Sequence, residues 1–417
     1  MERSVSRAIR VSSPVSRRLS FRKELCMDIF TKCRKYSVAN DIRAMGVYPY
    51  FHALETRQDN EVVMEGKRRI MLGSNNYLGL TTNPEVIEAG IRALEKYGTG
   101  CSGSRFMNGT LKMHLELEAE LADFLRKDEA VIFPTGFQTN LGIISAIVGH
   151  GDYVICDKEN HASIYDGCKL SYGRMLTYAH SNMEELEIQL QKVPETAGCL
   201  IVTDGVFSMG GDIANLPEIV RLARKYSARI LVDDAHGLGV LGEGGRGTPS
   251  HFGLEKEIDI YMGTFSKSLA SLGGYAACDH VVADFIRHNA RPFIFAASTP
   301  PASCAVALAA LRYIRSHPEI VERLSSLAAY MRNGLRERGI PIIESTTPII
   351  PIYTYDAKNT LFKAKELYDA GVYVNPVLPP ATPADKCLLR TSYMATHTHT
   401  LLDEALEILQ EVLGKRE

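Results

Sequence analysis

A single lysine among small residues is the first feature of this sequence that could do covalent chemistry. Lys267 lies in the segment 263–274, GTFSKSLASLGG, and no other lysine or arginine occurs between Lys256 and Arg287. The apolar run 258–262 before it predicts a short buried strand, and open α/β sheets place their ligand sites at strand ends. A partly desolvated lysine has a lowered pKa, which favours Schiff-base chemistry. A loop lysine that reaches solvent is the alternative.

An acidic pair at the end of a second apolar run is the next candidate. Asp233 and Asp234 follow residues 230–232, and His236 comes shortly after them. Because adjacent strand residues point to opposite faces, the two carboxylates cannot both face one ligand. A buried carboxylate is costly unless it meets a positive partner, and a protonated pyridinium nitrogen would be one. A metal site or a solvated strand end would explain the same residues.

Two more positions follow strand-like runs and could bind a cofactor. Gly136 stands where a helix is expected to begin, and bare backbone N–H groups at a helix N-terminus can bind phosphate. A plain helix cap would look the same. His161 follows the run 153–156, and its ring could stack on a flat cofactor or simply cap a helix.

Alternating strand-like and helical segments surround these positions and predict an α/β fold with a mostly parallel sheet covered on both faces. The strand-like runs are residues 130–133, 153–156, 200–202, 230–232, 258–262 and 275–278. After Pro300 and Pro301, long helices and short strands predict a smaller domain. We expect four parts: an extension at 1–26, an N-terminal helix and arm at 27–68, a large cofactor-binding α/β domain at 69–301, and a C-terminal α+β domain at 302–417.

Composition excludes several classes of protein. The chain has 417 residues and a formal net charge of -2, which gives no basic field for nucleic acid. Its nine cysteines form no CxxC pair and indicate a reducing compartment. Because no apolar run approaches a membrane span, we expect a soluble, cytoplasmic protein. Residues 1–26, rich in serine and arginine, resemble a transit peptide, but we favour an over-extended gene start before a helix over 28–45.

Six motifs in a fixed order resemble the α-oxoamine synthases, pyridoxal-phosphate enzymes that join an amino acid to an acyl-CoA with loss of CO2. The motifs are SNNYLG from Ser74, TGF from Thr135, residues 157–161, DGVFSM from Asp204, DDAH from Asp233 and TFSK from Thr264. The resemblance runs from about Val47 to the C-terminus. It implies a fold-type I enzyme like aspartate aminotransferase, and a homodimer with shared active sites.

The resemblance also implies a role for each residue around the cofactor ring. Lys267 would bind the aldehyde of pyridoxal 5'-phosphate covalently and then act as acid and base at the substrate's Cα. Asp233 would keep the pyridinium nitrogen protonated, and His161 would stack on the ring and help to orient the acyl donor. His236 and Ser208 would lie near the ring's phenolic oxygen.

The phosphate and the substrate would be held by further residues that the resemblance implies. The phosphate would be bound by Gly136, Phe137 and Thr264, with Ser298 of a second subunit as a further candidate. Arg390 would pair with the amino acid's carboxylate, with help from Asn75, because a guanidinium fork suits that group. Arg390 lies in an apolar run, and an edge arginine that extends to water is the alternative.

Within the family, three stretches look most like bacterial serine palmitoyltransferases: residues 100–106, 268–271 and 394–398. We therefore expect L-serine and a long-chain acyl-CoA, such as palmitoyl-CoA, as substrates. The lipid substrate leaves open a peripheral association with the membrane. Glycine C-acetyltransferase and 8-amino-7-oxononanoate synthase share most of these residues, and substrate tests must separate them.

Two other classes of protein remain to be weighed. A pyridoxal-phosphate aldolase or aminotransferase would use the same lysine and aspartate, but neither needs a thioester. A non-catalytic partner subunit would lack the lysine, and the presence of Lys267 argues against it.

Overall fold

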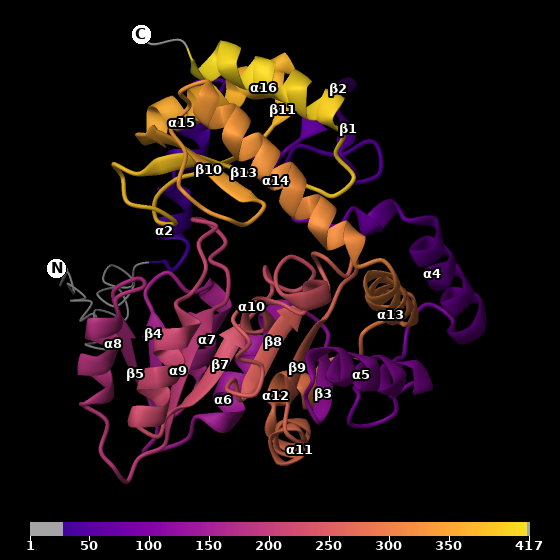
Figure 1. Cartoon of the computed structure of the whole chain (residues 1–417), viewed down its shortest axis with the longest axis vertical. Coiled ribbons are helices and arrows are strands. Elements are labelled where there is room, and N and C mark those ends of the chain that lie inside the picture. Colours follow the sequence, from indigo (N-terminus) through magenta and orange to yellow (C-terminus); the bar gives the residue numbers. More distant parts are fainter. Residues whose placement is uncertain (1–27, 415–417) are drawn as a thin grey trace, which may run out of the picture. The chain divides into compact units, whose positions relative to one another are not determined.

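The structure is a computed structural model that describes residues 28–414 (Figure 1). The predicted extension at residues 1–26 lies outside them. Contacts divide the chain into two units, Met1–Tyr48 and Pro49–Glu417. In the first unit, the expected helix over 28–45 is instead two short helices, α2 (Thr31–Arg34) and α3 (Val38–Ala44). Neither buries a residue, and helices this short gain little stability without packing.

The larger unit contains a seven-stranded sheet with strand order β3-β9-β8-β7-β6-β4-β5. Figure 1 labels all of these strands except β6. The strands are β3 (Glu129–Phe133), β4 (Tyr153–Asp157), β5 (Arg174–Tyr178), β6 (Cys199–Asp204), β7 (Arg229–Asp233), β8 (Ile260–Thr264) and β9 (Gly274–Cys278). Five neighbouring strands, from β5 to β8, run parallel. Strand β9 runs in the opposite direction to the other six strands of this sheet, so its pairs with β3 and β8 are antiparallel. The mostly parallel α/β sheet predicted from the sequence is confirmed.

Two hydrophobic clusters cover the opposite faces of this sheet, as strand alternation requires. In β3, Ala130 and Ile132 belong to one cluster, whereas Val131 and Phe133 belong to the other. The first face carries α5 (Lys112–Leu125), α8 (Met183–Leu190), α9 (Leu216–Lys225) and α13 (Pro301–Ser316). The second face carries α6 (Gly136–Ile147), α7 (Ala162–Leu170), α11 (His280–Asn289) and α12 (Arg291–Ile294). The helices therefore hold the strand ends in fixed positions.

Two three-stranded sheets complete the larger unit. One consists of β10 (Ile349–Tyr355), β13 (Cys387–Ser392) and β12 (Asn375–Val377), which pair antiparallel. The other joins the hairpin of β1 (Glu61–Met64) and β2 (Lys67–Met71) to β11 (Val372–Tyr373). The accompanying helices are α14 (Glu319–Glu337), α15 (Ala357–Ala370) and α16 (His399–Leu413). The domain limits expected from the sequence stay a prediction.

The remaining helices are short connectors or lie on the periphery. They are η1 (Leu80–Thr82), α4 (Pro84–Tyr97), η2 (Glu243–Gly245) and α10 (Thr248–His251). Within residues 28–414, no helix has both the length and the apolar character that a bilayer crossing demands.

Candidate active site

A pocket of about 240 Å³ opens at the carboxyl ends of β6, β7 and β8. Its lining residues are Thr135, Gly136, Phe137, His161, Ser163, Asp204, Ser208, Asp233, Ala235, His236, Met262, Thr264, Ser266, Lys267 and Leu272. The site residues expected from the sequence all belong to this lining except Asn75, Ser298 and Arg390. Residues from distant parts of the chain thus converge where parallel strands end, as in other open α/β sheets.

Lys267 follows β8 and is half-buried at the pocket wall. Desolvation in the pocket lowers the pKa of its amine to about 8, although the charges of Asp233 and Asp204 oppose this shift. At pH 7 an amine with this pKa is about one-tenth unprotonated, far more than an ordinary lysine, and only the unprotonated amine can attack an aldehyde. The lysine therefore has the environment that covalent chemistry requires.

Asp233 and Asp234 point to opposite sides of the sheet, as strand geometry predicts. Asp233 lines the pocket, and its Oδ2 accepts a hydrogen bond of 2.7 Å from Nδ2 of Asn140. Asp234 instead accepts bonds from the backbone and hydroxyl of Thr248, at 2.8 and 2.6 Å. Among residues 28–414, no group of three or more possible ligands could hold a metal. Asp233 is thus the acid that can face a cationic ring nitrogen.

A hydrogen-bond network fixes His161 beside this carboxylate. The backbone N–H of His161 donates to Oδ2 of Asp204 at 3.0 Å, and its Nδ1 lies 2.7 Å from the hydroxyl of Ser163. Nδ2 of Asn140 donates to the same hydroxyl at 2.9 Å and to Asp233. Burial lowers the pKa of His161, so its ring is neutral at pH 7. A neutral, fixed imidazole is suited to stacking on a flat ring.

Asp204 and Asp233 occupy paired positions on the neighbouring strands β6 and β7. Burial raises the pKa of Asp204 well above its usual value, and the nearby charge of Asp233 raises it further. Burial at this position therefore favours the protonated form of the Asp204 carboxyl.

The first turn of α6 forms a compact anion cradle. The hydroxyl of Thr135 accepts the N–H of Gln138 at 3.2 Å and caps the helix at Gly136. A Cβ on Gly136 would lie 2.7 Å from Oγ1 of Thr264, so only glycine leaves this space open. The hydroxyls of Thr264 and Ser266 are 2.9 Å apart at the same place. Together with the helix N-terminus, these residues fit a phosphate group.

Arg390 is buried in β13 and does not extend to water, so the edge-arginine interpretation is wrong. Its Nε donates to the backbone carbonyl of Ser208. One terminal nitrogen donates to Oδ1 of Asn75 at 3.0 Å and to the hydroxyl of Tyr77 at 3.3 Å. The structure therefore places Asn75 and Arg390 together, and joins them to the pocket through Ser208.

Tyr77 connects this arginine to His236. Its hydroxyl lies 2.6 Å from Nδ1 of His236, and both side chains are buried. Burial lowers the pKa of His236 well below its usual value, with further lowering by Lys267 and Arg390, so the ring is neutral. The tyrosine hydroxyl has two acceptors within reach, Nδ1 at 2.6 Å and Oδ1 of Asn75 at 3.3 Å, and we assign its proton to the shorter bond, with Nδ1. The imidazole then carries its own proton on Nε2.

Ser298 is not part of the pocket lining of this chain. Its backbone N–H and hydroxyl both contact the carbonyl of Gly103, at 2.9 and 3.1 Å. A Cβ on Gly109 would lie 2.4 Å from the hydroxyl of Ser298, so the glycine allows this close approach. Its expected role in the phosphate site of a second subunit stays a prediction.

Five residues of the site had no role assigned from the sequence. They are Tyr77, Asn140, Ser163, Asp204 and Ser266. Tyr77, Asp204 and Ser266 lie inside the motifs that identify the family, and Asp204 also ends a buried strand. Asn140 and Ser163 lie on two helices, and only the packing of α6 on α7 brings them together.

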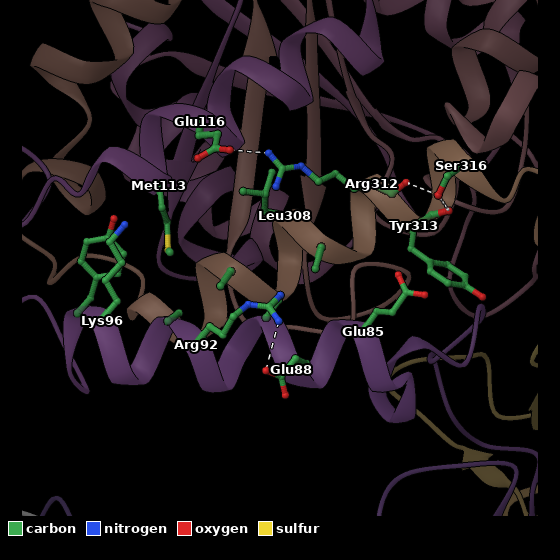
Figure 2. A pocket seen from close by; sticks show the side chains of 15 residues that line it. Glu85, Glu88, Arg92, Lys96, Met113, Glu116, Leu308, Arg312, Tyr313 and Ser316 are labelled. Carbon is green, nitrogen blue, oxygen red and sulfur yellow. Dashed lines mark hydrogen bonds and ion pairs between the residues drawn. The ribbon is translucent and has the colours of Figure 1, made fainter.

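A second, wider groove of about 620 Å³ lies between α4, α5 and α13 (Figure 2). Its charged side chains pair with one another across the surface. Arg92 contacts Glu88 at 3.3 Å, and Arg312 contacts Glu116. Exposed ion pairs of this kind contribute little to stability. Lys267, His161 and Asp204, whose pKa values are shifted by burial, line the smaller pocket instead.

Comparison with known proteins agrees with this geometry. A model of the aminotransferase class I and II family matches residues 67–409, and the chain belongs to this family. Its relatives place it more narrowly, among the α-oxoamine synthases. A serine palmitoyltransferase of Bacteroides thetaiotaomicron is 51% identical, over 91% of this chain and 96% of that protein. An 8-amino-7-oxononanoate synthase of Bacillus velezensis is 43% identical, over 86% and 91%.

A solved structure supports the same placement. A variant serine palmitoyltransferase from S. paucimobilis, with a bound PLP-myriocin aldimine, superposes with a TM-score of 0.90 at 39% identity. The similarity covers 93% of this chain and 98% of that one. The family and the fold type expected from the sequence are thereby confirmed.

Proposed function

We propose that this protein uses pyridoxal 5'-phosphate to condense L-serine with a long-chain acyl-CoA, best palmitoyl-CoA, releasing CoA and CO2. The product is a 2-amino-ketone. The single observation that carries this proposal is the arrangement of Lys267, Asp233 and Arg390 around one pocket. It provides a nucleophilic amine, an acid for a ring nitrogen and a buried cation for a carboxylate. The identity to serine palmitoyltransferases supports the choice of substrates.

Bound pyridoxal phosphate supplies an electron sink that stabilises negative charge at the substrate's Cα. Lys267, with its lowered pKa, would hold the aldehyde and move the proton at Cα. Asp233, held by Asn140, would keep a proton on the ring nitrogen. Arg390 and Asn75 orient the carboxylate, and a fixed orientation selects the bond that breaks.

The rim of the pocket supports a long acyl chain as the second substrate. Phe137 and Leu272 line the pocket and are exposed, and Met209 adjoins the lining residue Ser208 and is also exposed. Exposed apolar side chains beside a polar site can bind an apolar chain without altering the reacting centre. The rim thus suits an acyl chain that extends outward.

We further propose a homodimer, in which Ser298 completes the phosphate site of the partner. Ser298 is held against the loop that contains Gly103. Exposed apolar side chains flank it on both segments: Phe106, Met107 and Phe295. Exposed apolar groups concentrated in this way indicate a protein interface. Cytoplasmic location and peripheral membrane association stay predictions.

The test is a matrix of serine, glycine and alanine against acetyl-CoA and palmitoyl-CoA, with release of the CoA thiol as the readout. We expect the highest kcat/KM for serine with palmitoyl-CoA, and CO2 in equal amount. Lys267→Ala protein serves as the background control. Preference for glycine with acetyl-CoA, or for alanine, would assign the chain to another branch of the family. Turnover without any thioester would indicate an aldolase or aminotransferase.

A further inference from the structure

His180 lies outside the pocket, in the loop after β5, and bridges two carboxylates. Its Nδ1 is 3.0 Å from Oδ1 of Asp157, and its Nε2 is 3.0 Å from Oδ2 of Asp212. The ring packs edge-on against Phe207, with 4.5 Å between centroids. An imidazole can donate from both nitrogens only when it is protonated. This geometry is therefore that of a cation between two anions.

The surroundings of His180 favour the charged form. Burial alone would lower the pKa of His180, but hydrogen bonds and charges from Asp157 and Asp212 raise it to about 10. Glu159, after β4, adds a third carboxylate at 3.9 Å. Glu185 of α8 accepts the backbone N–H of Ala179, the residue before His180. These facing groups are all acids, so the ring keeps its charge at neutral pH.

Asp157, the first partner, shapes the turn that leads to His161. It ends β4 and is almost fully buried. Its Oδ1 also accepts the N–H of Glu159, and its Oδ2 accepts the N–H of Ser181, both at 2.8 Å. The carbonyl of Asp157 accepts the N–H of Asn160. His161 follows directly, so the position of its ring depends on this turn.

Asp212, the second partner, belongs to the hairpin 205–214, which carries Ser208. The hairpin is closed by a bond from the N–H of Phe207 to the carbonyl of Asp212, at 2.9 Å, and by a bridge between Val206 and Ile213. Ser208 at its tip lines the pocket, and its carbonyl accepts from Arg390. The orientation of the substrate-binding arginine thus depends on this hairpin.

We propose that His180 is a positioning residue for the condensation. As a cation it ties the turn 157–161, which carries His161, to the hairpin 205–214, which carries Ser208 and anchors Arg390. It contacts neither substrate nor cofactor, and acts through these two segments. This inference rests on the proposed function, because it assigns His161 and Arg390 to the reaction.

Three variants of the holoenzyme test the tie, by amide hydrogen exchange and by steady-state kinetics. His180→Gln removes the charge and has donors at one end of its amide only, so an acceptor oxygen replaces the second donor of the imidazolium. We expect exchange in residues 205–214 to accelerate by about tenfold, and the KM for serine to rise by roughly 5–20-fold, the cost of one weakened charged hydrogen bond. The KM for palmitoyl-CoA should rise less than the KM for serine, because the turn that carries His161 keeps the bonds of Asp157 to Glu159 and Ser181. His180→Arg, a permanent cation with two donor ends, should restore both quantities.

The third variant, Asp212→Asn, neutralises one end of the tie. In this variant, amide hydrogen exchange should accelerate in residues 205–214 but not in residues 157–161. His150→Gln, the same change near the opposite end of β4, is the matched control and should leave exchange and kinetics unchanged. Normal exchange and normal serine KM in His180→Gln would overturn the proposal. Failure of His180→Arg to restore them would do the same, since packing alone would then explain the loss.

Exchange rates need no turnover, so they test the tie independently of the condensation. If the wild-type protein fails to condense serine but exchange responds as expected, the tie stands and the proposed function fails. If condensation occurs and exchange is unaffected by His180→Gln, the tie fails and the proposed function stands.

Discussion

The hydroxyl of Tyr77 lies 2.6 Å from Nδ1 of His236, although the two residues are separated by 159 positions in the chain. The same hydroxyl accepts a hydrogen bond from Arg390. One tyrosine thus connects the histidine expected near the cofactor's phenolic oxygen to the arginine expected at the substrate's carboxylate. Because its proton is directed at Nδ1, His236 presents an N–H group at Nε2, which can donate to an anionic oxygen.

Replacing Tyr77 by phenylalanine should therefore disturb the histidine without removing the cofactor. We expect retained binding of pyridoxal phosphate, a shifted pH titration of the visible absorption band, and a fall in kcat of roughly tenfold from one lost hydrogen bond. Tyr393→Phe is the control, because Tyr393 is also fully buried but its hydroxyl accepts a hydrogen bond from Thr391, outside the pocket. An absorption band and kcat equal to those of the wild type would show that His236 is oriented by other contacts.

The lysine amine should determine how fast the apoprotein takes up its cofactor. The pKa of Lys267 is lowered to about 8, and only the unprotonated amine reacts with an aldehyde. The second-order rate of uptake should rise as pH increases through 8 and level off above it. Stopped-flow absorbance measures this rate. A rate that continues to rise toward pH 10 would indicate an ordinary, solvated lysine, and Lys267→Ala should give no borohydride-reducible absorbance at any pH.

The carboxylate at the end of β7 should control proton removal from the substrate. Asp233→Asn replaces the carboxylate by a neutral amide and changes the group that accepts the hydrogen bond from Asn140. The ring nitrogen of the cofactor then loses its acidic partner. We expect cofactor to remain bound, while exchange of the serine Cα proton with solvent deuterium falls below detection by NMR. The neighbouring change Asp234→Asn alters a residue that faces Thr248 and should leave exchange intact. Rapid exchange in Asp233→Asn would remove this residue from the electron-sink role.

The buried arginine should affect one substrate and not the other. Arg390→Ala removes a cation that the carboxylate of serine would meet, a charged hydrogen bond that contributes roughly 1.5–3 kcal/mol. The KM for serine should therefore rise by roughly 10–100-fold. The KM for palmitoyl-CoA should change little. Equal increases for both substrates would point to a general disturbance of the fold.

His180 should make a contribution to stability that depends on pH. Its pKa is about 10 in the folded protein and near 6.5 when unfolded, so the folded state holds the extra proton between these values. Stabilisation by His180 is complete below pH 6.5 and is lost as pH rises toward 10. Urea denaturation should show the largest difference between wild type and His180→Gln near pH 6, and little difference near pH 10. A constant difference would mean that charge is not involved.

Much of the fold was predictable because the central strands are buried on both faces and read as apolar runs. β5, with the sequence RMLTY, was not predicted, because it lies at the sheet edge and only Tyr178 is fully buried. The antiparallel direction of β9 depends on the turn after Lys267, for which the sequence has no periodic signal.

The residues of the candidate site also divide into those that the sequence indicates and those that only the packing brings together. Asp233 ends one buried strand and Lys267 follows another, so their positions after apolar runs indicated them. Asn140, which contacts Asp233, lies inside a helix, and its partner is set by the way α6 packs on the sheet. A contact that depends on tertiary packing has no local pattern in the sequence.

The parallel pairing of β2 with β11 joins Ile70 to Val372 and Met71 to Tyr373. A nascent chain exposes β1 and β2 at the ribosome long before β11 is synthesised. Until then one edge of β2 has no strand to pair with, and bare strand edges promote aggregation. Completion of this sheet must therefore wait until residues 372 and 373 have been synthesised, and premature termination before residue 372 should produce a chain that needs a chaperone to stay in solution.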